Sequence, residues 1–126
     1  NAQFESDDFT LLGQEDMKVL SVRPLLKRLF AMRQAGAPAA DLSQRFHAAL
    51  SAGLAQLALA TIPAGQTVCL SGGTFLNRFM ATDLVQRLTE MGYRTYLPSQ
   101  LPPGDGAISF GQCAVAWQRL NAANLI

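Results

Sequence analysis

The sequence is poor in the side chains that most often carry catalysis or hold a metal ion. It contains one histidine, His47, and two cysteines, Cys69 and Cys113. Because a zinc site needs several imidazole or thiolate ligands, none can be assembled from these residues alone. No Ser/His/Asp nucleophile arrangement can be assigned either. We interpret His47 as a histidine that packs beside the apolar stripe of a helix or caps it.

The two cysteines are far apart in the sequence and form no CxxC pair. Such spacing fits neither a disulfide framework nor a zinc knuckle. Cys69 falls in a predicted strand and Cys113 in a predicted helix. We therefore expect both to be reduced, buried thiols of a cytoplasmic protein, with a reactive thiol as the alternative.

Charged residues are also scarce, at 15% of the chain, and ten Lys and Arg oppose nine Asp and Glu. This balance favours neither nucleic acid nor an anionic membrane as a partner. No apolar run approaches the roughly 20 residues that a membrane span needs. The apolar fraction of 49% is nevertheless large enough for a packed core.

The length of 126 residues fits one domain or a piece of a larger one. The sequence starts at Asn1 without a methionine, and it has too few predicted strands for a complete parallel sheet. We expect residues 1–126 to be a single fragment, the C-terminal portion of a larger enzyme. Residues 1–16 are polar, acidic and without periodicity, which indicates an irregular lead-in and no signal peptide.

Hydrophobic periodicity predicts the remaining elements. The first half should contain a strand or loop at 17–22 and helices at 24–35 and 38–60. The second half should read strand, helix, strand, helix, at 67–71, 76–91, 93–97 and 107–121. The last helix should bury an apolar face that consists of Ile108, Phe110, Ala114, Val115 and Trp117.

Two strands joined by a crossover helix within one sheet must be parallel. Their carboxyl ends then meet at one edge, where ligands bind in open α/β sheets. Gly72-Gly73 follows the first of these strands and Asp105 follows the second. We therefore expect the glycines and Asp105 to lie side by side.

The residues at this edge have the chemistry of a nucleotide site. Backbone N–H groups at Gly72 and Gly73, where a helix opens, favour phosphate. The neighbouring Ser71 and Asn77 can hydrogen-bond phosphate, ribose or base. The pattern is neither Walker A nor GxGxxG, and a tight turn that needs positive φ is the alternative.

Asp105 has two interpretations. Aspartate is a common helix N-cap, and it is also a ligand for a hard metal ion beside a triphosphate. The glycines on both sides, Gly104 and Gly106, would let a bulky ligand approach. Glycines and one carboxylate together suggest a nucleotide with its metal ion.

Four stretches of the sequence resemble one family. They are SGGTFLNRFMATDLVQRL, TYLPSQLPPGDGAISFGQCAVA, VRPLLKRLF and RFHAAL. Together they are similar to the C-terminal end of HypF, the hydrogenase-maturation carbamoyltransferase family. The resemblance implies an α/β fold, an incomplete actin/Hsp70-like ATPase subdomain of the TsaD-like kind, with helices packed on its sheet.

The resemblance also implies a reaction. HypF-like enzymes convert carbamoyl phosphate and ATP to carbamoyl adenylate and pass the carbamoyl group to the C-terminal cysteine of a HypE-like partner. By the match of motifs, Gly72, Gly73 and Asn77 would bind the nucleotide and Asp105 a divalent metal ion. The remainder of the parent chain would supply the family's metal-binding histidines, so this fragment alone should be inactive.

Two positions depart from the family pattern, with Leu76 in place of glutamine and Gly104 in place of asparagine. Two alternatives remain open. One is another carbamoyl or threonylcarbamoyl transferase with a tRNA or small-molecule acceptor, and the other is a non-catalytic nucleotide-binding module. The Pro102-Pro103 turn followed by Gly111-Gln112 favours HypF, and the near-neutral charge speaks against tRNA.

Overall fold

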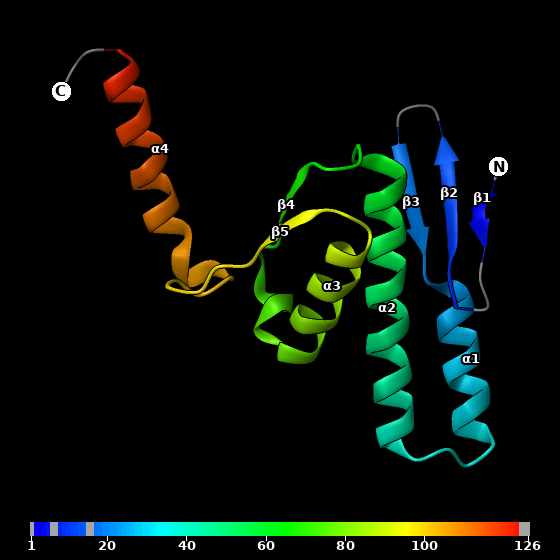
Figure 1. Cartoon of the computed structure of the whole chain (residues 1–126). Helices are drawn as coiled ribbons and strands as arrows, with labels where there is room; N and C mark the ends of the chain where they lie inside the picture. Colours follow the sequence, from blue (N-terminus) through cyan, green and yellow to red (C-terminus); the bar gives the residue numbers. More distant parts are fainter. Residues whose placement is uncertain (1, 6–7, 15–16, 124–126) are drawn as a thin grey trace.

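The computed structural model describes residues 2–5, 8–14 and 17–123 and shows a small mixed α/β fold with two separate sheets. Helix α2 stands in the middle (Figure 1). The first sheet and α1 lie on one side of it, β4, β5 and α3 lie on the other, and α4 extends away. The elements are β1 (Ala2–Glu5), β2 (Thr10–Gln14), β3 (Met17–Ser21), α1 (Arg23–Gln34), α2 (Ala39–Thr61), β4 (Thr67–Cys69), the 3₁₀ helix η1 (Gly73–Leu76), α3 (Arg78–Glu90), β5 (Arg94–Tyr96), the 3₁₀ helix η2 (Asp105–Ala107) and α4 (Ile108–Ala122).

The irregular lead-in expected at 1–16 is wrong for the described part of that segment. Strand β1 pairs antiparallel with β2, and β2 pairs antiparallel with β3. Phe9 and Leu11, 6% and 2% exposed, point to one face of this sheet. Leu20 of β3 packs on Gly53 of α2, where an added Cβ would come within 3.0 Å of the Leu20 Cδ2. The apolar alternation is too short to stand out among acidic residues, and only the packing on α2 reveals it.

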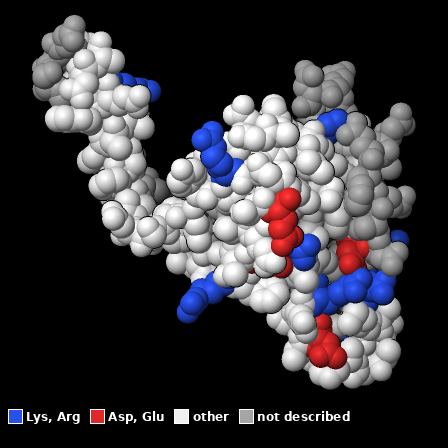
Figure 2. All heavy atoms as spheres, viewed as in Figure 1, with Lys and Arg blue, Asp and Glu red and all other residues white. Residues whose placement is uncertain are grey.

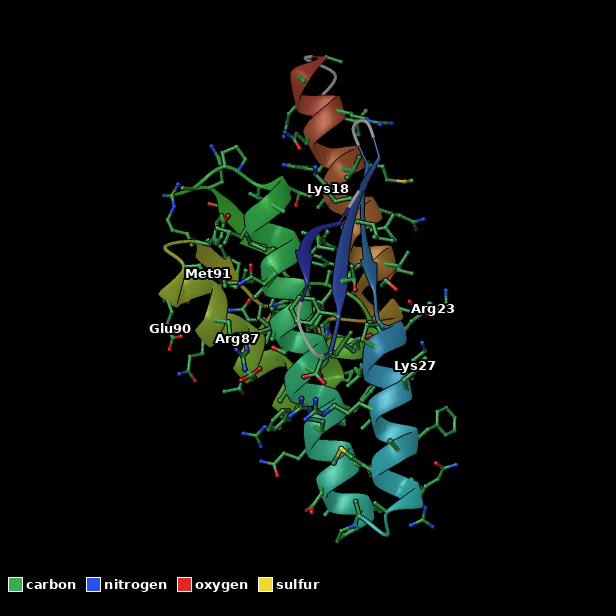
Figure 3. The ribbon with its side chains drawn as sticks, turned by 90° about the vertical axis from the view of Figure 1, so that its right-hand side faces the viewer. Lys18, Arg23, Lys27, Arg87, Glu90 and Met91 are labelled. Atoms are coloured by element: carbon green, nitrogen blue, oxygen red, sulfur yellow. The ribbon has the colours of Figure 1, made fainter. Side chains whose placement is uncertain are left out.

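Helices α1 and α2 follow the predicted boundaries closely. Helix α1 stops before Gly36, whose φ of 87° ends it. Its cations are exposed, and Figure 3 shows Arg23 and Lys27 projecting from it. In α2 the buried residues are small, and they allow close approach of neighbouring elements. They are Ala49, Ser51, Gly53 and Ala55.

An ion pair and a hydrophobic core fasten the elements around α2. Arg45 of α2 binds Asp8 with two nitrogens, its Nη2 lying 2.6 Å from Oδ2 and its Nε 3.1 Å from Oδ1. On the other side of α2, the buried core joins α2, α3 and the second sheet. It consists of Ala55, Leu70, Leu84, Leu88 and Tyr93. Strands β4 and β5 pair in parallel next to this core, as predicted. In their register Val68 lies opposite Thr95.

Helix α4 corrects another expectation, because none of its residues is buried. Phe110 is 60% exposed and Trp117 63%, although both were expected in the core. The proline-containing segment after β5 leads the chain away from the other elements (Figure 1). The apolar side chains of α4 therefore stay largely exposed, although Ile108 and Phe110 border hollows near the ends of β4 and β5. Cys69 and Cys113 are likewise exposed free thiols, not buried ones.

The surface is weakly charged over much of the view in Figure 2. The limb formed by α4 carries one charged residue, Arg119. Among the described helices, none combines the length and the apolar character that crossing a bilayer requires.

Candidate functional site

The two glycine-containing turns meet at the carboxyl ends of β4 and β5. The backbone N–H of Gly72 donates to the Pro103 carbonyl at 2.6 Å, and the Ser71 hydroxyl donates to the same oxygen at 3.2 Å. A Cβ added to Gly104 would lie 3.4 Å from the Gly73 Cα. Parallel pairing of the strands causes this contact, because it brings both carboxyl ends to one edge. The predicted juxtaposition of the two turns is therefore confirmed.

The paired glycines differ in what their backbone requires. Gly72 has φ 111° and ψ 159°, a conformation that essentially only glycine adopts. Gly73 has no positive φ, and a Cβ added there would meet no atom within 4 Å. The alternative of a turn that needs positive φ thus accounts for Gly72 alone. At Gly73 the side that a Cβ would occupy is open, whereas Gly104 borders the backbone.

A short 3₁₀ helix separates the glycines from the α-helix that follows. The helix expected from Leu76 begins at Arg78 instead, so its positive end is not at the glycines. The first hydrogen bond of η1 runs from Phe75 N–H to the Gly72 carbonyl, and the N–H groups of Gly73 and Thr74 precede it. These two N–H groups, and not those of α3, are the donors next to the turn.

Asn77 starts α3 because its side chain caps that helix. The Oδ1 atom accepts from Phe79 N–H at 3.0 Å and from Met80 N–H at 3.3 Å. The Nδ2 atom lies 2.9 Å from Nε2 of His47 on α2. Most of the hydrogen-bonding capacity of Asn77 is therefore used within the protein.

His47 is the site residue for which the sequence held no local signal. Its Nδ1 lies 2.6 Å from the Ser43 carbonyl, one turn earlier in α2. Its ring meets those of Phe46 and Phe79 edge-on, at centroid distances of 5.4 Å and 5.8 Å. The expected packed or capping role is correct as far as it goes. Its partner Asn77 belongs to another element, which periodicity along α2 cannot show.

Asp105 is exposed and stands at the start of η2. The N-cap of η2 is Gly104 and that of α4 is Ala107, and neither helix has a side-chain cap. The N-cap interpretation of Asp105 is therefore wrong. Within the described ranges, no group of three or more His, Cys, Asp or Glu side chains could hold a metal ion. Asp105 thus offers one carboxylate to a site that needs further ligands.

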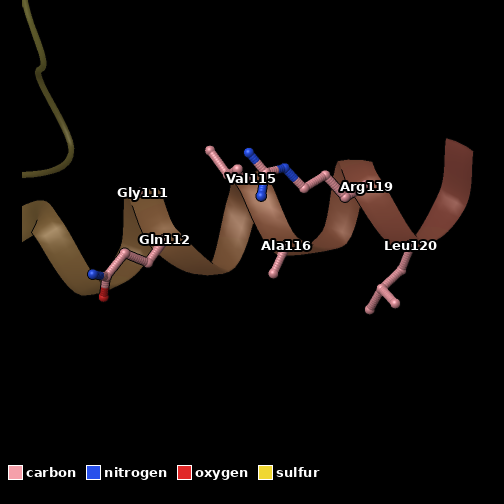
Figure 4. Close-up of a pocket in the computed structure, with 6 residues that line it drawn as sticks. All are labelled: Gly111, Gln112, Val115, Ala116, Arg119 and Leu120. Atoms are coloured by element: carbon pink, nitrogen blue, oxygen red, sulfur yellow. The ribbon is translucent and has the colours of Figure 1, made fainter.

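A hollow of about 600 Å³ opens beside these turns, within the size range of small-molecule sites. It includes Cys69 and Ser71 from the end of β4 and Tyr96 from the end of β5. A smaller hollow of about 270 Å³ reaches Gly104, and Ser71 lines both. A further hollow is lined by α4 alone (Figure 4), and one helix face cannot enclose a ligand.

Comparison with known proteins connects this arrangement to one family. Residues 2–112 match the family model described as the second subdomain of the Kae1-like domain of a carbamoyltransferase. Carbamoyltransferase HypF2 of Cupriavidus necator is 41% identical over 102 residues, which cover 79% of this chain and 12% of that protein. A second protein of that organism, named as a carbamoyltransferase HypF homolog, is 33% identical over 116 residues, or 83% of this chain and 28% of its own length.

A solved structure is similar in fold as well. The crystal structure of full-length HypF in its phosphate- and nucleotide-bound form matches with a TM-score of 0.74 at 29% identity. The match covers 93% of this chain and 16% of that one. The chain therefore spans between about an eighth and just over a quarter of the relatives it matches.

Proposed function

Because the chain belongs to the HypF carbamoyltransferase family, we propose that it is the part of such an enzyme that meets the nucleotide. The contact between the Gly72-Gly73 turn and the Gly104-Asp105 turn carries this proposal. It joins open backbone N–H groups and a carboxylate at one edge of a parallel sheet. Nucleotides bind at such edges in α/β folds.

The proposed reaction has two stages. Carbamoyl phosphate, ATP and water yield carbamoyl adenylate, pyrophosphate and phosphate. A partner's C-terminal cysteine thiolate then takes the carbamoyl group, and AMP leaves. The partner would be a HypE-like protein in nickel–iron hydrogenase maturation. A free acceptor thiol requires a reducing compartment such as the cytoplasm.

The residues of this chain would bind and orient the nucleotide. The N–H groups of Gly73 and Thr74 would donate to phosphate oxygens, which preorganised backbone donors stabilise as charge shifts in the transition state. A phosphate could approach on the side that a Cβ of residue 73 would occupy, since no atom lies within 4 Å of that position. Asn77 would border the nucleotide from the far end of η1.

A divalent metal ion fits the donor chemistry of this edge in part. Asp105 is an exposed carboxylate next to the phosphate-binding turn, and carboxylate oxygen is a preferred ligand of hard cations. The remaining ligands would come from the longer enzyme of which we propose this chain is a part. When bound, the metal would neutralise phosphate charge.

Two other functions fit the same fold, namely a carbamoyl or threonylcarbamoyl transferase with another acceptor and a non-catalytic nucleotide-binding module. The near-neutral charge of the chain speaks against tRNA as acceptor. No comparable observation favours the non-catalytic module.

The test uses the full-length protein that carries this chain. Pyrophosphate release from ATP is measured with and without carbamoyl phosphate, and transfer of labelled carbamoyl to the partner's thiol is followed separately. Wild type is compared with Asp105→Asn and with the control Asp41→Asn, which changes an exposed aspartate of α2. We expect pyrophosphate release to depend on carbamoyl phosphate in the wild type. We expect carbamoyl transfer to be impaired in Asp105→Asn and to be normal in Asp41→Asn. If pyrophosphate release were the same with and without carbamoyl phosphate, the proposal would be overturned.

A further inference from the structure

We propose that His47 is a positioning residue that fixes the orientation of the Asn77 carboxamide beside the glycine turn. The inference rests on the proposed function, in which that turn meets a nucleotide. His47 itself stands on α2 and acts through Asn77, since its Nε2 lies 2.9 Å from the Asn77 Nδ2.

The hydrogen-bond polarity of the pair follows from its fixed partners. The Ser43 carbonyl can only accept, so the His47 Nδ1 at 2.6 Å must carry the proton. In the neutral ring, Nε2 then keeps its lone pair and accepts from the Asn77 amide group. At the other end of that amide, Oδ1 accepts from two backbone N–H groups.

These constraints leave the Asn77 amide one orientation. If the amide flipped, its NH₂ would face the N–H groups of Phe79 and Met80, and its oxygen would face the His47 lone pair. Both contacts would be repulsive. Without His47, Asn77 would still be oriented by the N–H groups of Phe79 and Met80, and it would lose the orienting effect of the His47 lone pair.

The orientation matters because Asn77 ends the turn that Gly73 begins. The Asn77 backbone N–H donates to the Thr74 carbonyl at 3.1 Å and closes η1. Of the two Nδ2 protons, one is taken by His47, and the planar amide fixes the direction of the other. His47 thereby links helix α2 to a donor at the border of the proposed phosphate site.

The competing explanation is that His47 only packs against Phe46 and Phe79. Two substitutions separate the explanations. His47→Phe keeps an aromatic ring and removes the acceptor, whereas His47→Gln removes the ring and can present Oε1 near the position of Nε2. A positioning role predicts that glutamine rescues and phenylalanine does not. A packing role predicts the reverse.

Nuclear magnetic resonance on the 126-residue chain tests the hydrogen-bond polarity of the His47–Asn77 pair. Because the sequence has a single histidine, its ring nitrogen signals need no assignment by mutation. We expect a neutral ring with the proton on Nδ1. A ring with its proton on Nε2 would overturn the proposal, whatever the chain binds.

Titration of the full-length protein that carries this chain with ATP and Mg²⁺ measures nucleotide binding, because that protein supplies the remaining ligands of the proposed site. We expect His47→Phe to weaken binding about fivefold to tenfold, the effect of one hydrogen bond, and His47→Gln to stay within about twofold. Ser43→Ala removes the hydroxyl, whose Oγ lies 3.4 Å from the His47 Nδ1, and keeps the carbonyl at 2.6 Å; because the carbonyl fixes the ring, this variant should bind as wild type. If His47→Phe bound ATP as tightly as the wild type does, the positioning role would be overturned. If the full-length protein that carries this chain bound no ATP, the proposed function would be overturned, while the ring signals would still decide the His47–Asn77 contact.

Discussion

The backbone of Gly73 touches Gly104, so closely that a Cβ on Gly104 would stand 3.4 Å from the Gly73 Cα. The adjacent hydrogen bond from Gly72 N–H to the Pro103 carbonyl ties the same two turns together. A distance of 3.4 Å is an ordinary van der Waals contact. A Cβ at position 104 would therefore fit, and the glycine found there is not required by this contact.

The two glycines of the first turn should respond differently to alanine. Gly72→Ala forces φ 111° on a residue with a Cβ and should lower the free energy of unfolding by about 1–3 kcal/mol. Gly73→Ala meets no atom within 4 Å and should change it by less than about 0.5 kcal/mol. Urea denaturation of both variants measures the difference. Equal losses would contradict it. If phosphate approaches Gly73, that variant should also bind ATP more weakly.

Asp83 should make stability depend on pH. Burial is the largest single influence and would raise its pKa, but the hydrogen bond from Arg87 Nε at 2.8 Å, the neighbouring Ser51 and the charge of Arg87 together outweigh burial and hold the pKa below the ordinary 3.8. A lowered folded-state pKa stabilises the fold above that ordinary value, and the contribution is lost as the pH falls through 3.8 toward the folded-state pKa.

Asp83→Asn should therefore lower the free energy of unfolding by about 0.5 kcal/mol at neutral pH, as expected for a partly exposed helical ion pair four residues apart. Its difference from wild type should shrink in acid. Arg87→Ala should reproduce the effect, and the double variant should lose no more than either single one. Urea denaturation at about pH 7 and about pH 3 measures all four proteins. If the difference in the free energy of unfolding between wild type and Asp83→Asn were the same at both pH values, the Asp83–Arg87 ion pair would not be its source.

The hydroxyl of Tyr93 should contribute to stability where that of Tyr96 does not. Tyr93 is 3% exposed and donates to the Ile62 carbonyl at 2.8 Å, at the end of α2. Tyr93→Phe leaves this carbonyl without its donor and should lower the free energy of unfolding by about 1 kcal/mol. Tyr96 is 62% exposed, so Tyr96→Phe is the matched control and should be nearly neutral. Thermal or urea unfolding compares the two, and similar losses would refute the assignment.

The second half of the fold was predictable because its signals are local. Gly-Gly and Pro-Pro-Gly mark turns within a few residues, and the rule that a crossover connects parallel strands does the rest. From the sequence alone, that rule predicts that the Gly73 and Gly104 turns lie together. The strands themselves are shorter than predicted, since β4 ends at Cys69 and β5 at Tyr96.

The errors lie where a residue's environment depends on a distant partner. Leu11 of β2 and the preceding Phe9 belong to the core only because the sheet packs on α2, where a Cβ added to Gly53 would lie 3.4 Å from the Phe9 Cδ1. Conversely, Trp117 and Phe110 lie on a correctly predicted helix, and they stay exposed because no described element packs on α4. Amphipathic pattern shows that a face can be buried, and it does not show what buries it.

The sequence by itself determined the family resemblance, the order of strands and helices after Thr67 and the residues of the two turns. Those features depend on neighbours in the chain, on glycine's conformational freedom and on the handedness of crossovers. Only the tertiary structure decided that Asn77 caps α3 with its amide turned to His47, and that Asp105 caps nothing. Hydrogen bonds between side chains need positions set to within a few tenths of an ångström, and packing of α2 against α3 sets them.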